Sequence, residues 1–264
     1  MKIKKFDIIT IIRKINPNII FMGYSFRDKL NVIISLFILG PLRKLGITKK
    51  EILITMKSDN NLLICGDKSI HVARPDYEKS IRNFFDLDGG VFIDIGANLG
   101  KYTIFMGKKL GNKGFVISIE PENHTVKLLK KNIILNKLKN VVVVEKACSS
   151  KTGKSTLYLE GTKYSGGLHS LKKYTHHVNE IEIEVETLDS IISRLGFKRV
   201  DLIKIDVEGS EVEVLEGAQK IIRKYHPKII CESLDKSSEE KITNLLKKFK
   251  YIVKRVSPEN VWAY

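Results

Sequence analysis

Three charged residues in the segment 201–211 are of types that can bind a polar ligand or accept a proton. The segment reads DLIKIDVEGSE, with Lys204, Asp206 and Glu208 at alternate positions. Residues two apart on a β-strand point to the same face, and charges in an apolar strand are costly to bury unless they pair or contact a ligand. We therefore predict that Lys204 and Asp206 face a ligand crevice, with Glu208 in the turn that follows. A purely structural Lys204–Asp206 ion pair is the alternative.

A glycine-containing turn earlier in the chain predicts a second part of the same crevice. The segment Asp94–Gly100 reads DIGANLG and follows an apolar run. Glycines at a strand-to-helix turn let the backbone approach a ligand closely. The spacing excludes a Walker phosphate loop and differs from the dinucleotide fingerprint. The carboxylate of Asp94 would repel a pyrophosphate but suits a cationic amino group.

Two more runs end in residues suited to a nucleoside. Glu120 follows the run 115–119, and a carboxylate at the tip of this strand can accept hydrogen bonds from both ribose hydroxyls. The run 141–144 leads into the position where an adenine edge would lie, although Lys146 stands where an Asp is expected. The predicted nucleoside contacts are Asp94, Gly96, Asn98, Gly100, Glu120, Glu145 and Ala147.

A further carboxylate, Glu232, ends the run 228–231 at the same predicted edge. Asp206, Glu208 and Glu232 together could hold a divalent cation, because hard cations prefer carboxylate oxygens. Two carboxylates near a substrate could equally act as base and orienting group. Both interpretations stay open from the sequence.

The elements that must position these residues alternate between strand-like and helix-like segments. Such alternation predicts βαβ units and a mostly parallel sheet covered by helices on both faces. A final pair of strands predicts an antiparallel C-terminal hairpin. The expected strands are 91–95, 115–119, 141–144, 155–159, 181–186, 200–205, 228–231, 251–256 and 261–264, and the expected helices are 100–110, 123–136, 210–224 and 237–249.

Residues 1–75 are expected to form an N-terminal basic helical region and a β-hairpin, and residues 76–264 the main domain. The segment 1–48 is helix-like, with breaks predicted at Asn16-Pro17 and Gly40-Pro41. Two strand-like runs, 52–56 and 62–65, flank a polar turn and predict the hairpin. A helix is predicted over 76–85.

The chain carries a net charge of +16. More than half of this charge lies in the first 50 residues, which hold 11 basic and two acidic residues. This charge does not by itself favour nucleic acid, because basic residues do not alternate with aromatics as in a base-stacking groove. Peripheral contact with a membrane through the basic N-terminal region is one interpretation, and a solvated face is the other. The apolar run 32–39 is too short to span a bilayer. Cys65, Cys148 and Cys231 are expected as reduced core residues of a cytoplasmic protein.

The stretch 91–233 resembles the FkbM-type family of S-adenosylmethionine-dependent, class I methyltransferases. The Lys-x-Asp-x-Glu-Gly and Thr-Leu-Asp-Ser segments are the most specific. The resemblance leaves out residues 1–75 and the last 30. The matching segments occur in the family's order: Phe92–Gly100, Ile119–Pro121, Glu186–Ser190, Val200–Glu211, Val214–Ala218 and Pro227–Glu232.

This resemblance implies a Rossmann-like, doubly wound seven-stranded sheet. It also implies S-adenosylmethionine as the methyl donor, held at Asp94, Gly96, Asn98 and Glu120. The expected activity is O-methylation of a hydroxyl on a sugar, glycan or small metabolite. RNA methylation at the same donor site and a non-catalytic nucleoside- or partner-binding domain are the alternatives.

Methyl transfer to a sugar hydroxyl calls for a base or a metal, because such a hydroxyl is a poor nucleophile. Asp206 is the first candidate for the base, aided by Glu208, with Lys204 orienting Asp206 or a substrate oxygen. His169, His176 and His177, in and beside the loop 161–177, could contact the acceptor, although loop histidines are more often without a catalytic role.

Overall fold

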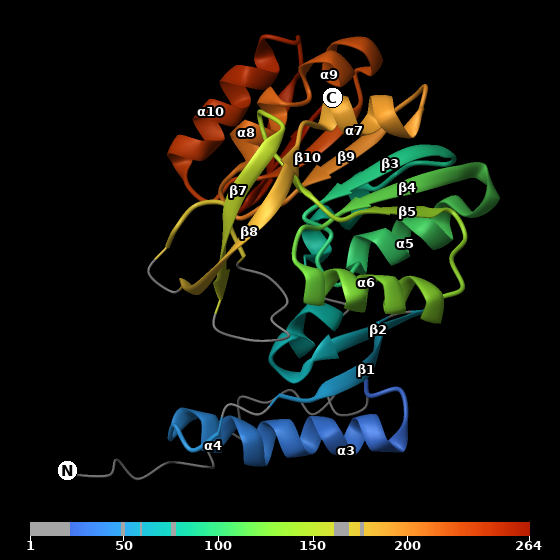
Figure 1. Cartoon of the computed structure of the whole chain (residues 1–264). Coiled ribbons are helices and arrows are strands. Elements are labelled where there is room, and N and C mark those ends of the chain that lie inside the picture. Colours follow the sequence, from blue (N-terminus) through green and yellow to red (C-terminus); the bar gives the residue numbers. More distant parts are fainter. Residues whose placement is uncertain (1–21, 49–50, 59, 75–77, 161–168, 175–176) are drawn as a thin grey trace.

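The computed structural model describes residues 22–48, 51–58, 60–74, 78–160, 169–174 and 177–264. Its centre is a seven-stranded sheet in the order β11-β12-β10-β9-β3-β4-β5 (Figure 1). The strands from β10 to β5 are parallel, and β12 pairs antiparallel with both β10 and β11. The predicted sheet and its C-terminal hairpin are confirmed. The strands are β3 (Gly90–Ile95), β4 (Gly114–Ile119), β5 (Val141–Val144), β9 (Leu202–Ile205), β10 (Lys228–Glu232), β11 (Val253–Ser257) and β12 (Asn260–Ala263).

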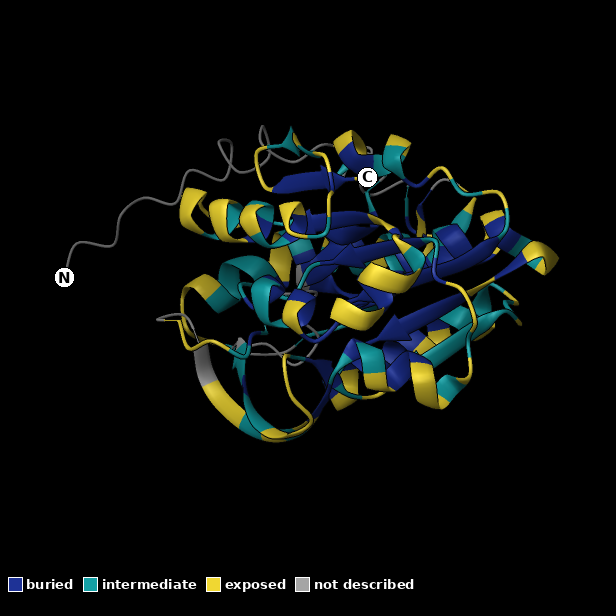
Figure 2. Cartoon of the chain, turned by 90° about the horizontal axis from the view of Figure 1, so that it is seen from above, coloured by how far each residue is buried: buried dark blue, intermediate teal, exposed yellow. Residues whose placement is uncertain are grey.

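Helices cover both faces of the sheet because its strands are apolar on both sides. On β3, Ile93 and Ile95 pack on one face, while Phe92 packs on the other. The outer surfaces of the helices are exposed, and the strands between them are buried (Figure 2). The first face is covered by α7 (Leu188–Leu195), α8 (Glu211–Glu216), α9 (Gln219–Tyr225) and α10 (Lys236–Lys247), and the second by α5 (Lys101–Leu110) and the 3-10 helix η3 (Lys79–Phe84).

Two predicted helices differ from the structure. The helix expected over 210–224 is split into α8 and α9 at Gly217, where the backbone passes so close to the carbonyl oxygen of Ser149 that a side chain would overlap it. The carboxylate of Asp189 accepts hydrogen bonds from the first N–H groups of α9, which stabilises its new start. The helix expected over 76–85 is the 3-10 helix η3, and residues 75–77 lie outside the described part of the chain.

A three-stranded sheet in the order β6-β8-β7 stands beside the end of the main sheet that carries the strand-to-helix turns. It consists of β6 (Ala147–Cys148), β7 (Gly153–Glu160) and β8 (His177–Glu186), which confirms the strands predicted over 155–159 and 181–186. An isolated antiparallel bridge between Tyr158 and Ser170 pairs the segment 169–174 with β7. His176 lies outside the described residues.

Residues 26–44 form one continuous helical rod that packs against a hairpin. The rod comprises α3 (Phe26–Ile34), the π-helix η1 (Ser35–Leu39) and α4 (Gly40–Lys44). The break predicted at Gly40-Pro41 is wrong: Gly40 is helical, and the proline occupies the first turn of α4, where its missing N–H is tolerated. The predicted hairpin is confirmed as β1 (Leu53–Ser58) and β2 (Asn61–Gly66), followed by the 3-10 helix η2 (Asp67–Ala73). The break predicted at Asn16-Pro17 lies outside the described residues.

Two asparagines join this hairpin to the main domain. Asn132 lies in α6 (Asn123–Leu135), and Asn136 is the C-cap of that helix. The Asn132 amide accepts from the Ile64 N–H at 2.6 Å and donates to the Ile64 carbonyl at 3.0 Å. Asn136 makes the same pair of bonds with Leu62. Because the edge of β2 would otherwise leave these backbone groups unpaired, the two side chains act as a partner strand. Apolar side chains of the rod, the hairpin, α5 and α6 share one buried cluster beside them.

Candidate active site

A row of polar side chains crosses three neighbouring strands on the α5 face of the sheet. Ser118, Asp94 and Lys204 are register partners on β4, β3 and β9. The Thr103 hydroxyl, from α5, donates to Asp94 Oδ2 at 2.7 Å and lies 2.7 Å from the Ser118 hydroxyl. Burial raises the pKa of Asp94, while Lys204 and Thr103 act against that rise. Asp94 therefore lies in a buried network beneath the crevice.

Lys204 and Asp206 form an ion pair at the end of β9. Lys204 Nζ donates to Asp206 Oδ2 at 2.7 Å, and the lysine is 3% exposed. Burial alone would lower the pKa of Lys204, but the carboxylates of Asp206, Asp94 and Glu78 together raise it above its ordinary value. The ammonium also lies 4.9 Å from the centre of the Tyr102 ring. A permanently charged lysine is thus fixed beside Asp206.

The turn after β9 is shaped by a carboxylate that the sequence reasoning did not use. Glu211 is 1% exposed and accepts from the N–H groups of Val207 at 3.2 Å and Gly209 at 2.9 Å. In this turn Glu208 has φ 55° and Gly209 has φ 101°, and both values lie in the left-handed region. The two bonds from Glu211 hold this unusual backbone, and the backbone sets the position of the Glu208 side chain.

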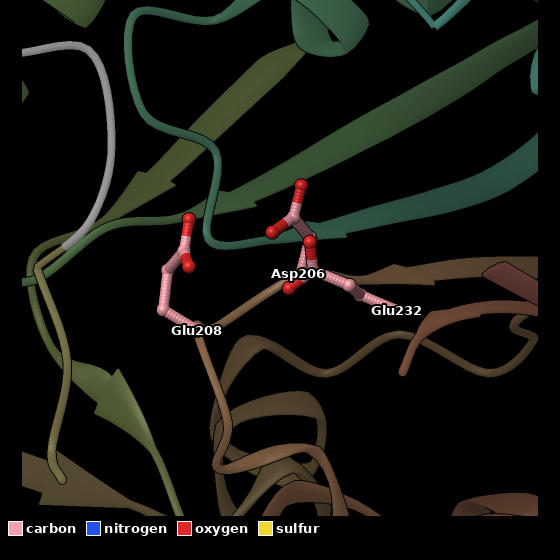
Figure 3. A group of neighbouring side chains, drawn as sticks. All are labelled: Asp206, Glu208 and Glu232. Atoms are coloured by element: carbon pink, nitrogen blue, oxygen red, sulfur yellow. The ribbon is translucent and has the colours of Figure 1, made fainter. Parts of the chain in front are cut away.

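Three carboxylates meet beside this turn (Figure 3). Asp206 and Glu208 come from the turn after β9, Glu232 comes from the end of β10, and their oxygens lie within 4.8 Å of one another. Burial, followed by the charges of Asp206 and Glu208, raises the pKa of Glu232 well above its usual range. A protonated Glu232 relieves the repulsion between three neighbouring carboxylates.

Glu120 lies at the tip of β4 and is held by backbone donors. It accepts from the Asn98 N–H at 3.0 Å and from the Glu122 N–H at 3.1 Å. Burial raises its pKa to about 7, against the effect of these two hydrogen bonds. The side-chain oxygen of Asn98 is buried and has no hydrogen-bond partner. A ligand with several hydroxyl or amino donors would satisfy both residues.

One pocket connects Glu120 with the Lys204–Asp206 pair. Seven of the residues singled out in the sequence line it: Gly96, Asn98, Glu120, Ala147, Lys204, Asp206 and Glu208. His169 also lines it, which leaves the prediction that it contacts an acceptor open. Four other predicted site residues are not part of the lining: Asp94, Gly100, Glu145 and Glu232.

Two of these four have clear structural surroundings. The Glu145 carboxylate is about half exposed and pairs with Lys130 at 2.5 Å on the surface. Its neighbour Lys146 lines the pocket instead and pairs with Glu184 at 2.9 Å. Gly100 is the N-cap of α5 with φ 89°, and a side chain there would overlap Leu129.

Gly96 lines the pocket, and the packing of the chain also requires a glycine at this position. Its φ is 76°, and a side chain there would overlap the carbonyl oxygen of Asp206 on the adjacent strand. The sequence reasoning ascribed the glycine to close approach by a ligand. The structure shows close approach by the chain itself, which brings the turn after β3 against the turn after β9.

Glu78 and Tyr102 are pocket residues that the sequence reasoning missed as site residues. The Tyr102 hydroxyl donates to Glu78 Oε2 at 2.8 Å, and both residues line the pocket. Burial raises the pKa of Glu78, with Lys204 acting against it. The sequence placed Glu78 inside the helix predicted over 76–85, whereas the structure gives it a left-handed φ of 52° immediately before η3. Only the folding of this segment over the sheet edge brings it to the site.

A parallel sheet of this order, with an antiparallel C-terminal hairpin and a carboxylate at the tip of its second strand, is the Rossmann-like fold of class I methyltransferases. The sequence matches the methyltransferase FkbM domain over residues 94–253. The chain belongs to this family of S-adenosylmethionine-dependent methyltransferases.

Individual relatives agree with this assignment. The chain is 29% identical over 147 residues to methyltransferase 1 of Beauveria bassiana (strain ARSEF 2860), a match that covers 49% of this chain and 59% of that protein. It is 26% identical over 157 residues to methyltransferase sdnD of Sordaria araneosa, covering 48% and 60%. The matches thus span about three fifths of the length of these curated relatives.

A solved structure shares the fold. The methyltransferase FkbM of Methylobacillus flagellatus KT superposes with a TM-score of 0.51 at 18% identity, over 74% of this chain and 53% of that one. Among the described residues, no helix is both long enough and apolar enough to cross a membrane.

Proposed function

We propose that this chain transfers a methyl group from S-adenosylmethionine to a hydroxyl oxygen of a sugar, a glycan or a small metabolite. The observation that carries this proposal is the charge of the pocket. Its lining includes four carboxylates, Glu78, Glu120, Asp206 and Glu208, against three lysines. A lining with this balance offers acceptors to many hydroxyl donors and disfavours the phosphates of a nucleic acid.

The donor end of the pocket is formed by the tips of β3 and β4. Glu120 would accept the ribose hydroxyls, and the unpartnered oxygen of Asn98 would accept a further donor. The backbone of Gly96 and Ala147 completes this end of the pocket, with Lys146 beside Ala147 in place of the expected Asp. When bound, S-adenosylmethionine supplies a methyl group already activated on a sulfonium.

The acceptor end is formed by the turn after β9 and by Glu78. Asp206 would take the proton of the acceptor hydroxyl, and Lys204, 2.7 Å away, balances the charge of Asp206 and fixes its orientation. Glu208 would accept a second hydroxyl of the acceptor. Positioning supplies most of the rate in such a transfer, because the methyl group needs no further activation.

A divalent cation at Asp206, Glu208 and Glu232 is the competing interpretation of the acceptor end. The three carboxylates are close enough to share an ion. However, the Lys204 ammonium already contacts Asp206 at 2.7 Å and supplies positive charge where a cation would bring it. We therefore expect the activity to persist in EDTA. Activity that requires added Mg²⁺ would assign these carboxylates to a metal.

Calorimetric titration with S-adenosylmethionine, S-adenosylhomocysteine and NAD tests the donor site. We expect the first two to bind and NAD not to bind. Glu120→Ala should weaken binding about 10²- to 10⁴-fold, the cost of about two hydrogen bonds to a charged group. The control is Glu240→Gln, an exposed residue of α10, which should change nothing. Binding of NAD alone would refute the proposal.

Asp206→Asn tests the base. We expect kcat with a sugar or small-molecule acceptor to fall about 10²- to 10⁴-fold, because a positioned base contributes about that much. The affinity for S-adenosylmethionine should change less than about threefold, because the donor contacts lie on β3 and β4. An unchanged kcat would remove Asp206 from the base role and leave positioning alone as the source of rate.

A further inference from the structure

The helical rod of residues 26–44 has two opposite apolar faces, and only one is used inside the molecule. Val32 and Leu39 are buried, and Val32 belongs to the cluster shared with the hairpin and α5. The hydroxyl of Ser35, on the same face, donates to buried Asp67 at 2.6 Å. This face holds the rod against the body of the protein, and in Figure 1 the rod forms the edge of the molecule beyond β1.

The outward face carries a stripe of four exposed apolar residues with the spacing of one helix face. Phe26, Leu30, Ile33 and Phe37 are 84%, 44%, 38% and 40% exposed. The spacing of four, three and four residues places them in a single row along the helix. Isolated exposed apolar residues are common, but a contiguous row of large ones marks an interaction surface.

Basic residues flank this stripe, and the one acidic residue of the rod is turned inward. Arg27 is exposed and Lys29 is half-buried on either side of Phe26 and Ile33. The carboxylate of Asp28 accepts from the Thr55 N–H at 2.9 Å and from Ser25, so its charge is used for capping and for the hairpin. The first 50 residues of the chain hold 11 basic and two acidic side chains.

We infer that this face of the rod lies on an anionic membrane surface. An amphipathic helix with aromatic residues on its apolar face and basic residues beside them is the arrangement that binds the headgroup region. The local positive charge is complementary to anionic lipid, and each basic residue near such a surface adds to the affinity. The rod would lie parallel to the membrane, because it is too short and too polar to span it.

The rod is connected to the pocket through the hairpin. The rod packs on β1, β2 continues into η2, and Val72 of η2 lines the pocket. A methyl acceptor attached to a lipid or displayed at the membrane would thus be close to the enzyme. The membrane contact itself does not depend on the proposed methyl transfer, and the two are tested separately.

Co-sedimentation of the full chain with vesicles tests the contact. We expect binding to phosphatidylcholine vesicles that contain phosphatidylglycerol, weaker binding to phosphatidylcholine alone, and a loss of binding as salt is raised. The double variant Phe26→Ser/Phe37→Ser should lower the partition coefficient between vesicles and water about tenfold or more. The reason is that two aromatic side chains that would insert into the lipid headgroup region are lost.

A matched control alters two exposed apolar residues elsewhere. Ile134 and Ile252 are 75% and 57% exposed on other elements, and Ile134→Ser/Ile252→Ser should bind vesicles like the unaltered protein. A second variant, Arg27→Ser/Lys29→Ser, should weaken the preference for phosphatidylglycerol about tenfold and keep the weak binding to phosphatidylcholine. Circular dichroism and S-adenosylmethionine titration check that each variant is folded.

Two outcomes would overturn the inference. One is equal vesicle binding by the stripe variant and its control. The other combines two results. The unaltered chain binds neither kind of vesicle, and light scattering shows that it forms an oligomer that dissociates in the Phe26→Ser/Phe37→Ser variant. The second outcome would assign the stripe to contact between copies of this chain.

Discussion

At the scale of single residues, burial changes the pKa values of several ionisable groups in and around the site. Glu120, Asp94 and Glu232 all have raised pKa values because each lies away from water. Lys204 is the exception, because three carboxylates around it outweigh its burial and raise its pKa instead. The result is one fixed positive charge among carboxyl groups whose pKa values burial has raised, and the pKa of Glu120 lies at about 7.

Glu120 predicts a pH dependence of donor binding. Its pKa of about 7 in the free protein means that part of the population is protonated at neutral pH. Ribose hydroxyls donate to the ionised form and favour it, so binding below pH 7 must release a proton. We expect the affinity for S-adenosylhomocysteine to fall up to about tenfold per pH unit below pH 7 and to be flat above it. Calorimetry at several pH values measures this.

The matched variant for this pH dependence is Glu120→Gln, which has no proton to release. Its weaker binding should lose most of the slope, whereas Glu240→Gln should keep it. The same slope in Glu120→Gln would assign the proton to the ligand or to another group.

Glu78 is expected to act on the acceptor and not on the donor. It lines the acceptor end of the pocket and holds the Tyr102 hydroxyl at 2.8 Å. We expect Glu78→Gln to raise the KM for the acceptor about tenfold, the value of one charge-assisted hydrogen bond, with donor affinity unchanged. Steady-state kinetics with either substrate varied separates the two effects. A weakened donor site with normal acceptor KM would contradict this role.

At the scale of elements, local signals identified most helices and strands but not their interruptions. The apolar runs predicted the five parallel strands of the main sheet, because buried parallel strands are apolar on both faces. The split between α8 and α9 was not predicted, since it depends on the closeness of Gly217 to Ser149, 68 residues earlier in the sequence. The helix through Gly40-Pro41 was missed because the proline falls in a first helical turn that follows a π-helix.

The join between α6 and β2 is expected to contribute strongly to stability. Asn132 is fully buried and bonds the backbone of Ile64 and Leu99. Asn132→Ala would leave the buried Leu99 carbonyl and the two partly buried backbone groups of Ile64 without this partner, at a cost of about 2–3 kcal/mol. We expect the melting temperature to fall by about 5–10 °C. Differential scanning calorimetry measures this, with exposed Asn112→Ala as the control, and equal melting temperatures would show that water replaces the amide.

At the scale of the whole molecule, the N-terminal region and the main domain share a core and a site. The buried cluster that contains Val32 and Leu63 also contains Leu99, Ile104 and Leu128. Glu78 and Val72 reach the pocket from outside the matched segment 94–253. We propose that the described residues of 22–74 and the main domain, although distinct in sequence character, unfold as one unit.

The distribution of charge over the whole chain bears on nucleic acid as a substrate. Several basic residues of the main domain are paired, among them Lys130 with Glu145 and Lys154 with Glu182. We expect RNA binding to be weak and to disappear as salt rises to about 0.15 M, because only non-specific phosphate contact is available. Fluorescence anisotropy with a hairpin RNA measures this. Salt-resistant binding, together with transfer of labelled methyl groups to RNA, would favour the RNA methyltransferase alternative.

The sequence by itself determined the order of the elements, the parallel sheet, and the strand ends that carry Glu120, Lys204 and Asp206. These follow from local periodicity and from the rule that the carboxyl ends of parallel strands meet at one edge. It could not separate residues that line the pocket from those beneath or outside it, and so it grouped Asp94 and Glu145 with Glu120.

Only the tertiary structure decided the rest of the site. Glu78 and Glu211 take their roles from backbone turns with left-handed φ values and from contacts made across the fold. The outward stripe on the rod became visible only once the opposite face was seen to be buried. Such features depend on which surfaces remain after packing, and no local pattern contains that information.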